Sequence, residues 1–397
     1  MKIHLVSYLF YPDSLGGGAL YTDFARFMKS RGHEVRVTTT FSFYPQYRYR
    51  EEDSGISRRD ETFEEIPLRR IRMKLPRRYQ GWRRLIPELS FWQALRRRAR
   101  FDGWTPDVVI VGCPMLAQSL AARGLYGGGV PLIVVVQDLM VDAAAKLGII
   151  RARGFLKLLA WGERRALSGA DRLVTISEEM KTRLVELTGK NVAVMPNWIH
   201  GSLAVCASEE RTRAPATLFY SGNLGVKQGL PGFLPDFFAE ANGWTLQIHG
   251  DGPAAEDLRA VHRANPQFSL NPLLDEPEYV RTLSGATVCL ITQRAGAGDS
   301  FLPSKLLPAL ATGTPVLAVC DRTSPLGREV TEHGFGVVIA PGDRETLGAT
   351  LRRWREQPEA LETLCRRARE RSAYFQRDRI LGEYERLMQR VIAEAQR

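Results

Sequence analysis

Short apolar runs alternate with segments of helical spacing along most of this 397-residue chain, and this alternation limits the folds available to it. Near the N-terminus, apolar runs at 3–7 and 34–40 flank three glycines at 16–18 and helical spacing over 19–30. Strand, glycine loop, helix and strand in this order predict a doubly wound parallel α/β sheet, in which ligands bind beyond the carboxyl ends of the strands. The glycines lack the Gly-x-Gly-x-x-Gly spacing, so the sequence does not favour a nicotinamide or flavin cofactor.

The same alternation occurs in both halves of the chain. Further strand-like runs lie at 107–112, 131–136, 172–176 and 191–194 in the first half, and at 216–220, 244–249 and 287–292 in the second. With 44% apolar residues, a chain of this length has core for two such domains. We expect an N-terminal Rossmann-like domain at 1–200 with a basic insertion at about 41–105, a linker at 201–215, a C-terminal Rossmann-like domain at 216–370, and a terminal helix at 371–397.

Cysteine and histidine spacing gives no sign of a metal site or a disulfide framework. The five cysteines are scattered without a Cys-x-x-Cys motif, and no two of the six histidines have metal-ligand spacing. We therefore expect reduced cysteines, no metal and no bound cofactor, with a metal ion bridging a bound diphosphate left open. No apolar run reaches the ~18 residues of a membrane span, and the N-terminal run is too short for a signal peptide. These features favour a cytoplasmic protein.

Residues 69–100 carry twelve basic residues and a single acid, Glu88, within a chain of net charge +11. Aromatic side chains lie among them, and the candidates for membrane contact are Trp82, Arg83, Arg84, Trp92 and Arg97. Aromatic rings and guanidinium groups together suit an anionic membrane surface. A solvated basic helix with an ordinary buried face fits the pattern equally well. Nucleic acid is disfavoured, because no nucleic-acid-binding module accompanies the stretch.

A phosphate site is indicated by three elements of the second half. A predicted short helix is entered through Pro303 and Ser304, where it presents free N–H groups, and Lys305 adds a full positive charge. Two glycine-rich turns, one carrying Lys227 and the other at 250–253, follow strands of the same predicted sheet. Each element alone fits ordinary helix capping or a flexible loop. Together, at one edge of a sheet, they predict a seat for a nucleoside diphosphate.

Several short motifs resemble those of the group 1 glycosyltransferases of the family 4 type. They are the N-terminal glycine loop, Pro196-Asn197, Ser221-Gly222-Asn223, Lys227-Gln228-Gly229, Gly250-Asp251-Gly252-Pro253 and Ala311-Thr312-Gly313-Thr314-Pro315-Val316. Within the family, Gln137-Asp138-Leu139, Asp142-Ala143-Ala144 and Pro303-Ser304-Lys305 look most like the colanic-acid and O-antigen enzymes of exopolysaccharide assembly. The resemblance implies the GT-B architecture, in which two Rossmann-like domains face each other across a cleft.

The resemblance also implies a role for each motif. Lys227 and Lys305 would bind the donor diphosphate together with Asn223 and Ser304, while Gly17 and Gly18 would close over it from the N-terminal domain. Gly250, Asp251, Gly252, Pro253 and Leu306 would border the nucleotide. Asp138, with Asp142 as the alternative, would face the acceptor or the donor sugar. The expected catalytic residues are therefore Asp138, Lys227 and Lys305.

One departure from the family concerns the ribose contact. Most members carry two glutamates eight residues apart on the helix near Lys305, whereas the aligned positions here are Ser300 and Pro308. Asp299 lies beside the first of them, and the ribose contact stays unassigned. Because Pro308 has no backbone N–H, we expect it in the first turn of its helix or at a bend.

The implied function is transfer of a sugar, with retention, from a UDP- or GDP-sugar to a lipid-linked saccharide in bacterial exopolysaccharide or O-antigen assembly. The expected location is the inner face of the cytoplasmic membrane, with peripheral contact to anionic lipid. One alternative is a partner subunit of weak activity that binds nucleotide or lipid. Another is a glycosyltransferase that acts on a small soluble acceptor. For the terminal helix, the family implies packing on the N-terminal domain, and the alternative is a surface helix that closes the C-terminal sheet.

Overall fold

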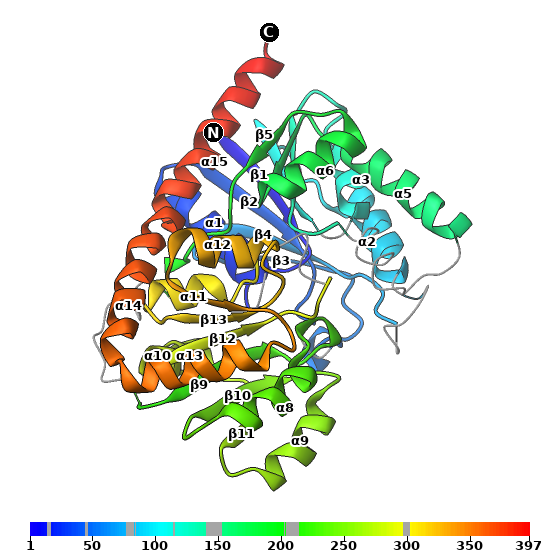
Figure 1. Cartoon of the computed structure of the whole chain (residues 1–397). Helices are drawn as coiled ribbons and strands as arrows, with labels where there is room; N and C mark the ends of the chain where they lie inside the picture. Colours follow the sequence, from blue (N-terminus) through cyan, green and yellow to red (C-terminus); the bar gives the residue numbers. More distant parts are fainter. Residues whose placement is uncertain are drawn as a thin grey trace. The chain divides into compact units, whose positions relative to one another are not determined.

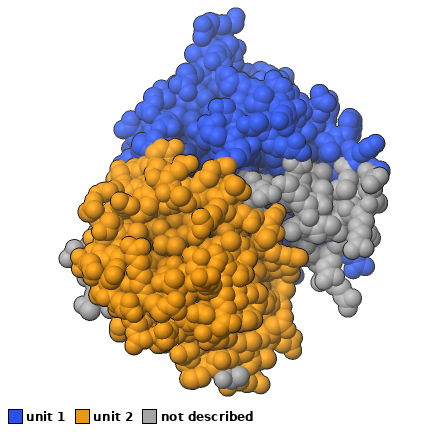
Figure 2. All heavy atoms as spheres, viewed as in Figure 1, with its two compact units in different colours: residues 1–197, 378–397 blue, residues 198–377 orange. Residues whose placement is uncertain are grey.

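The computed structural model divides the chain into two compact units (Figure 2). It describes residues 1–13, 17–43, 47–76, 83, 85–113, 116–139, 153–201, 203, 214–296 and 302–397. Unit 1 comprises Met1–Asn197 and Asp378–Arg397, and unit 2 comprises Trp198–Arg377. Each unit has its own sheet and its own hydrophobic core. The expected linker at 201–215 lies largely outside the described residues.

Unit 1 is built on an eight-stranded sheet in the order β3-β4-β2-β1-β5-β6-β7-β8 (Figure 1). Its strands are β1 (Lys2–Ser7), β2 (Glu34–Thr39), β3 (Arg58–Phe63), β4 (Ile66–Ile71), β5 (Val108–Cys113), β6 (Leu132–Val136), β7 (Arg172–Thr175) and β8 (Val192–Val194). Every neighbouring pair is parallel except β3 and β4. All five residues of β6 are apolar and buried, as in a sheet covered by helices on both faces.

The helices of unit 1 begin and end at recognisable signals. They are α1 (Gly17–Ser30), the 3-10 turn η1 (Glu51–Asp53), α2 (Leu85–Arg98), α3 (Leu116–Leu125), α5 (Arg153–Ser168), α6 (Glu178–Thr188) and α15 (Arg377–Ala395). At the start of α6 the Ser177 hydroxyl accepts a hydrogen bond of 3.2 Å from the Met180 N–H and so caps the helix. Gly189 ends α6 in the left-handed region, at φ 67°.

The predicted insertion at 41–105 does not interrupt the sheet but extends it. Within it, β4 pairs in parallel with β2, and β3 forms an antiparallel edge. Arg69 and Arg70, counted above among the surface cations, are only 4% and 6% exposed. The Arg69 guanidinium lies 2.7 Å from Asp60, and the Arg70 guanidinium lies 2.7 Å from Glu61. The basic stretch was therefore interpreted wrongly at these two positions, because carboxylates on the neighbouring strand allow the arginines to be buried.

The terminal helix expected at 371–397 begins later, at Arg377, as α15. The short turn η4 (Ala373–Phe375) separates it from the preceding helix, α14 (Pro358–Ser372). Helix α15 packs on unit 1, where the Tyr384 ring meets Phe24 edge-on at 5.8 Å between centroids. Nearby, Glu385 lies 2.8 Å from His33. The chain thus leaves unit 1 after Asn197 and returns to it for its last helix.

Unit 2 is built on a six-stranded parallel sheet in the order β11-β10-β9-β12-β13-β14. Its strands are β9 (Thr217–Asn223), β10 (Thr245–Asp251), β11 (Phe268–Asn271), β12 (Val288–Thr292), β13 (Val316–Val319) and β14 (Gly336–Ile339). Its helices are the turn η3 (Val226–Gln228), α8 (Leu230–Glu240), α9 (Ala255–Ala264), α10 (Glu276–Gly285), α11 (Leu306–Ala311), α12 (Pro325–His333), α13 (Arg344–Glu356) and α14. Two doubly wound parallel sheets confirm the predicted α/β fold class.

Candidate functional site

The lysine side chain of Lys305 lies at the carboxyl end of strand β9. Its ammonium nitrogen is 4.8 Å from the centroid of the Tyr220 ring. It also covers Gly222, where a Cβ atom would lie 2.9 Å from the Lys305 Nζ. Gly222 has a φ of 127°, a conformation that favours glycine. A glycine at this position therefore provides both the backbone turn and the space that the ammonium occupies.

Burial changes the acidity of Lys305. Desolvation lowers the pKa of its ammonium to about 8, because removal from water disfavours the charged form. Cys289 lies close by, and burial raises the pKa of that thiol to about 12, so the thiol is neutral at pH 7. The Lys305 ammonium is thus a partly desolvated cation, and no carboxylate contributes to the shift of its pKa. Such a cation gains free energy when an anion binds beside it.

Helix α11 differs from the predicted phosphate seat. The helix begins at Leu306 rather than at Ser304, has six residues, and includes Pro308 as its third residue. Pro308 therefore lies in the first turn, as expected for a residue without an N–H. A helix this short has a small macrodipole, and one of its first N–H groups is missing. The positive potential at this position consequently comes mainly from the Lys305 ammonium, while Ser304 is exposed and Leu306 is buried.

The glycines after strand β10 pack directly against the turn after β9. Gly250 pairs with Gly222 in the sheet register, and Asp251 pairs with Asn223. A Cβ on Gly250 would lie 2.3 Å from the Gly222 carbonyl oxygen, and one on Gly252 would lie 2.6 Å from Asn223 Oδ1. Close approach of two backbone turns thus explains both glycines without a ligand. Asn223 and Asp251, which follow in the same turns, are exposed at this edge.

Lys227 lies in the turn η3, four residues after the end of β9. Its carbonyl oxygen accepts a 2.8 Å hydrogen bond from the Arg294 N–H, which ties the turn to the segment after β12. Lys227 and Lys305 are the only lysines in residues 198–377. Both lysines belong to motifs named in the sequence analysis, and both lie on segments at the carboxyl edge of the unit 2 sheet.

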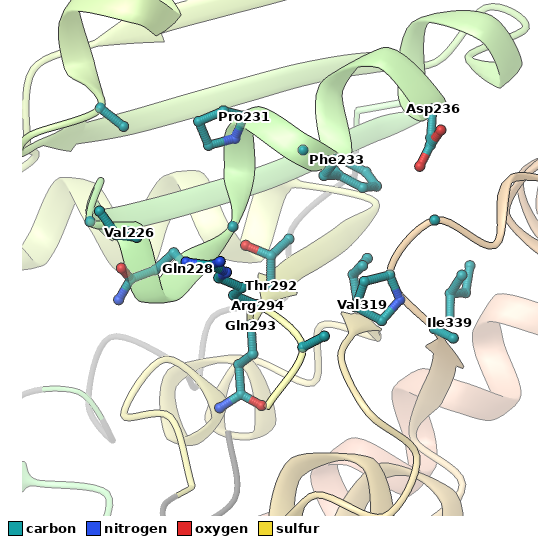
Figure 3. Close-up of a pocket in the computed structure, with 18 of the residues that line it drawn as sticks. Val226, Gln228, Pro231, Phe233, Asp236, Thr292, Gln293, Arg294, Val319 and Ile339 are labelled. Carbon is teal, nitrogen blue, oxygen red and sulfur yellow. The ribbon is translucent and has the colours of Figure 1, made fainter. Parts of the chain in front are cut away.

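The same edge contains a cavity of about 470 Å³ (Figure 3). Apolar side chains such as Phe233, Val319 and Ile339 line it. One charged residue of the lining is basic, Arg294, and three are acidic, Asp236, Asp257 and Asp343. The Thr292 hydroxyl, in a residue only 4% exposed, has no hydrogen-bond partner among the described residues. Of the predicted site residues, Pro253 lines this cavity, whereas Lys227 and Lys305 do not. The predicted residues of unit 2 therefore fall into two groups, with Pro253 at the cavity and Lys305 over Gly222.

In unit 1 the predicted residues lie at the carboxyl edge of its own sheet. Asp138 is partly buried two residues after β6. Its neighbour Gln137 donates a 3.0 Å hydrogen bond to Asn197 Oδ1, which brings two of the resembling motifs together. Gly17 and Gly18 form the start of α1, and a Cβ on Gly18 would lie 2.0 Å from the Asp13 carbonyl oxygen. Gly18 is thus required by helix packing, independently of any phosphate.

In the basic stretch at 69–100, the structure describes some of the candidates for membrane contact. Arg83 and Arg97 are exposed, and Trp92 is partly buried with the Arg96 guanidinium 5.0 Å from its ring. Trp82, Arg84 and Asp142 lie outside the described residues. Among the helices that the structure describes, none combines the length and apolar character needed to span a bilayer. Within the same residues, no cluster of three or more His, Cys, Asp or Glu side chains could hold a metal ion.

Comparison with solved structures defines the fold. Sucrose-phosphate synthase from Thermosynechococcus elongatus matches with a TM-score of 0.76 and 15% identity, over 99% of this chain and 100% of that chain. HepE from Anabaena, solved in complex with UDP, matches with a TM-score of 0.66 and 13% identity, over 98% of this chain and 100% of that chain. At these identities the likeness shows the fold, which is the GT-B fold of glycosyltransferases.

Sequence comparison then gives the enzyme class. Residues 16–198 match the model of a glycosyl transferase 4-like domain. The putative colanic acid biosynthesis glycosyl transferase WcaI of Escherichia coli K12 is 27% identical over 383 residues, which cover 89% of this chain and 91% of that protein. These matches confirm the expected resemblance and the enzyme class, which is a glycosyltransferase.

Proposed function

We propose that this glycosyltransferase moves a sugar from a UDP- or GDP-sugar to a lipid-linked saccharide in exopolysaccharide or O-antigen assembly, with retention of configuration. The observation that carries the proposal is the partly desolvated Lys305 ammonium over Gly222, at the carboxyl edge of a parallel sheet. This is the edge at which doubly wound sheets bind nucleotides. The UDP complex of HepE and the colanic-acid assignment of WcaI support the donor class and the polysaccharide product.

The proposed role of the two lysines is electrostatic. When the bond between the sugar and the diphosphate breaks, negative charge develops on the leaving diphosphate. A lysine ammonium that meets this charge stabilises the transition state more than the ground state, because the charge grows during the reaction. Lys305 and Lys227 would supply that charge from unit 2. Asp138, at the end of β6, would interact with a sugar hydroxyl in unit 1.

The test is turnover of a labelled sugar nucleotide by the purified chain. We expect slow release of free sugar from either UDP-glucose or GDP-mannose in water, and faster transfer when lipid-linked saccharides extracted from a capsule-forming bacterium are added. Release or transfer from neither donor would contradict the proposal. Binding of UDP without turnover would favour the partner subunit of weak activity, for which the loss of glutamate at Pro308 is the supporting observation.

Donor binding should weaken as pH rises above about 8. Lys305 is protonated below its pKa of about 8 and neutral above it, while the diphosphate diester of UDP-glucose keeps its charge. The dissociation constant should rise with pH. Above the pKa of Lys305 in the ligand-free protein, the rise should approach about 10-fold per pH unit, and it should stop once binding no longer depends on the charge of Lys305. Calorimetric titrations at pH 7, 8, 9 and 10 measure this, and the Lys305→Met variant should show a flat profile. A wild-type profile equally flat would exclude Lys305 from the donor site.

Peripheral contact with an anionic membrane is part of the proposal, and the exposed Arg83 and Arg97 would provide it. Each basic residue near such a surface contributes about 1 kcal/mol, so the double change of both arginines to glutamine should lower vesicle partitioning about 10- to 30-fold. Flotation with vesicles containing one third anionic lipid measures the bound fraction. The control replaces the exposed Arg259 and Arg353 of unit 2 by glutamine and removes the same charge. Equal binding by both variants would rule out docking through this segment.

A further inference from the structure

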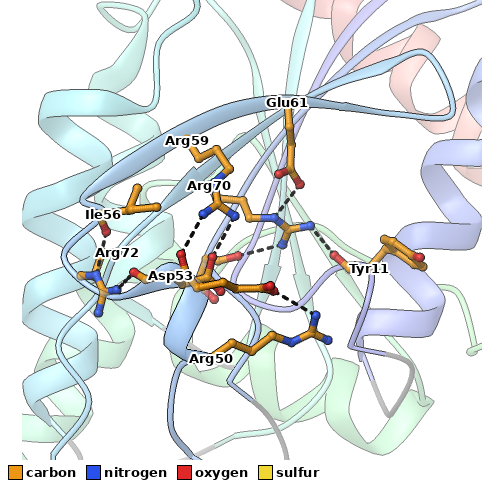
Figure 4. Close-up of polar contacts among 10 residues, drawn as sticks. Tyr11, Arg50, Asp53, Ile56, Arg59, Glu61, Arg70 and Arg72 are labelled. Atoms are coloured by element: carbon orange, nitrogen blue, oxygen red, sulfur yellow. Dashed lines mark hydrogen bonds and ion pairs between the residues drawn. The ribbon is translucent and has the colours of Figure 1, made fainter.

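Unit 1 contains a second, smaller cavity, which involves the hairpin of β3 and β4. Its volume is about 230 Å³, and its lining includes Tyr11, Arg50, Asp53, Arg59 and Arg70. We call it the hairpin pocket (Figure 4). Tyr11 follows β1 and Arg70 lies near the carboxyl end of β4, so the pocket lies at the ligand-binding edge of the unit 1 sheet. Pockets for drug-sized ligands measure about 300–1,000 Å³, so this one suits a single small ring.

The charges that line the hairpin pocket balance one another. Three arginines face three acids: Arg59 Nη1 lies 2.8 Å from Asp53 Oδ1, and Arg70 Nε lies 2.7 Å from Glu61 Oε1. Arg50 and Glu52 form the third pair at 3.4 Å. A phosphate or carboxylate in the pocket would approach three carboxylates as well as three guanidinium groups. The lining therefore favours an uncharged polar ligand over an anion.

Asp53 has unused hydrogen-bonding capacity in the pocket. The residue is 4% exposed, and its Oδ1 atom forms an ion pair with Arg59 without the geometry of a hydrogen bond. A carboxylate accepts about four hydrogen bonds and a guanidinium donates up to five. An acceptor and a donor side by side match a pair of neighbouring hydroxyl groups, since each hydroxyl both donates and accepts.

Tyr11 provides an aromatic surface at the same pocket. Its ring is stacked on Phe63 with centroids 4.5 Å apart and an interplanar angle of 29°, yet the residue is 49% exposed. The Arg26 guanidinium lies 5.1 Å from the Phe63 ring, so the ring below Tyr11 is itself held in place. One face of the Tyr11 ring is therefore covered, and much of the side chain stays open to a ligand. An aromatic side chain at the edge of a pocket that also holds paired charges suits a sugar ring, which has both C–H and hydroxyl surfaces.

Hydrogen bonds from arginine side chains to backbone carbonyl oxygens hold the pocket in place. Arg70 donates to the carbonyl oxygens of Tyr11, at 2.6 Å, and of Thr40, at 3.1 Å. Arg72 donates to the carbonyl oxygen of Ile56 at 2.7 Å and to that of Asp53. These contacts fix the loop after β1, the end of β2 and the turn η1 relative to one another. A preformed pocket loses less conformational entropy when a ligand binds.

We infer that the hairpin pocket binds one uncharged sugar ring of the acceptor saccharide, with Tyr11 stacking on the ring and Asp53 and Arg59 binding its hydroxyls. The inference rests on the proposed glycosyl transfer and adds to it the place and chemistry of an acceptor subsite. It also names the acceptor class at this subsite, a neutral pyranose rather than a uronic acid or a phosphorylated sugar.

The test is saturation-transfer NMR of the full chain with methyl glycosides of glucose, galactose, mannose and fucose, and with methyl glucuronide as the charged comparison. At least one neutral glycoside should receive saturation from the wild type. The signal should fall at least fivefold in Tyr11→Ala and in Asp53→Asn, and should persist in Tyr11→Phe, which keeps the ring. The matched control is Glu65→Gln, an exposed carboxylate of the same hairpin that pairs with Lys29 outside the pocket.

Three results would overturn the inference: no neutral glycoside signal, a signal unaffected by Tyr11→Ala and Asp53→Asn, or preference for the glucuronide. Calorimetry with UDP on the same samples separates this inference from the proposed function. If UDP binds but no glycoside does, the hairpin pocket is wrong and the donor site stands. If neither binds, both fail. Thermal unfolding of each variant shows whether a lost signal reflects a lost fold.

Discussion

Replacing Lys305 by methionine should lower kcat/KM for the sugar nucleotide by about 10²- to 10³-fold, the range for removal of one group that stabilises developing negative charge. Methionine keeps the apolar stem over Tyr220 and removes the ammonium over Gly222. Because burial already disfavours the charged form of Lys305, the variant should unfold at the same temperature as the wild type or a higher one.

The combination of lost turnover and retained stability distinguishes a binding role from a structural one. Initial rates at several donor concentrations give kcat and KM, and differential scanning calorimetry gives the unfolding temperature. The matched control is Lys181→Met, which removes a half-buried lysine that pairs with Glu178 in α6 of unit 1. Equal turnover by Lys305→Met and Lys181→Met would remove Lys305 from the mechanism. A large loss of stability in Lys305→Met would assign the lysine a structural role instead.

Replacing Gly18 by alanine should destabilise unit 1 by about 1–3 kcal/mol, whereas the same change at Gly17 should cost little. A Cβ at Gly18 would lie 2.0 Å from the Asp13 carbonyl oxygen, so the loop after β1 or the start of α1 has to move. A Cβ at Gly17 would lie 3.5 Å from the Tyr21 ring, an ordinary contact. Alanine is also the better helix former, so Gly17→Ala gains a little from helix propensity.

Denaturant unfolding of the two variants measures the difference, with the midpoint of the unit 1 transition as the readout. At about 2–4 °C per kcal/mol for a unit of this size, thermal unfolding should show a shift of several degrees for Gly18→Ala. Gly18→Ala should also weaken any ligand that depends on the loop carrying Tyr11. Equal stability of the two variants would show that the loop adapts and that packing does not require glycine at position 18.

The fold could be predicted from sequence because its signals are local. The buried strand β6 is a continuous run of Leu, Ile and Val, and glycine-rich turns follow strands such as β9. Strands β3 and β4 escaped prediction because their charged residues, Arg58 to Glu61 and Arg69 to Arg70, read as surface. The burial of Arg69 and Arg70 depends on ion pairs with the neighbouring strand, and the local sequence does not show which strand will pair with it.

The candidate site could be predicted only in part for a similar reason. The motifs located Lys305 and Lys227, since each follows a strand of the unit 2 sheet. The tyrosine beneath Lys305, Tyr220, lies inside an apolar strand and looked like ordinary core. The hairpin pocket joins residues from the loop after β1, from η1, from β3 and from β4, so no single stretch reveals it. Close packing of two turns explains the glycines at 250 and 252, and this packing is visible only in three dimensions, while their contact with nucleotide stays a prediction.

The most direct test of the donor site is a calorimetric titration of the purified wild-type chain with UDP, GDP and ADP, repeated with Lys227→Ala. We predict that one of the three binds with a stoichiometry of one per chain and that Lys227→Ala weakens it at least 10-fold. That result would identify the donor nucleotide and place its diphosphate at the unit 2 lysines. Failure of all three nucleotides to bind at millimolar concentration would contradict a sugar-nucleotide donor for this chain.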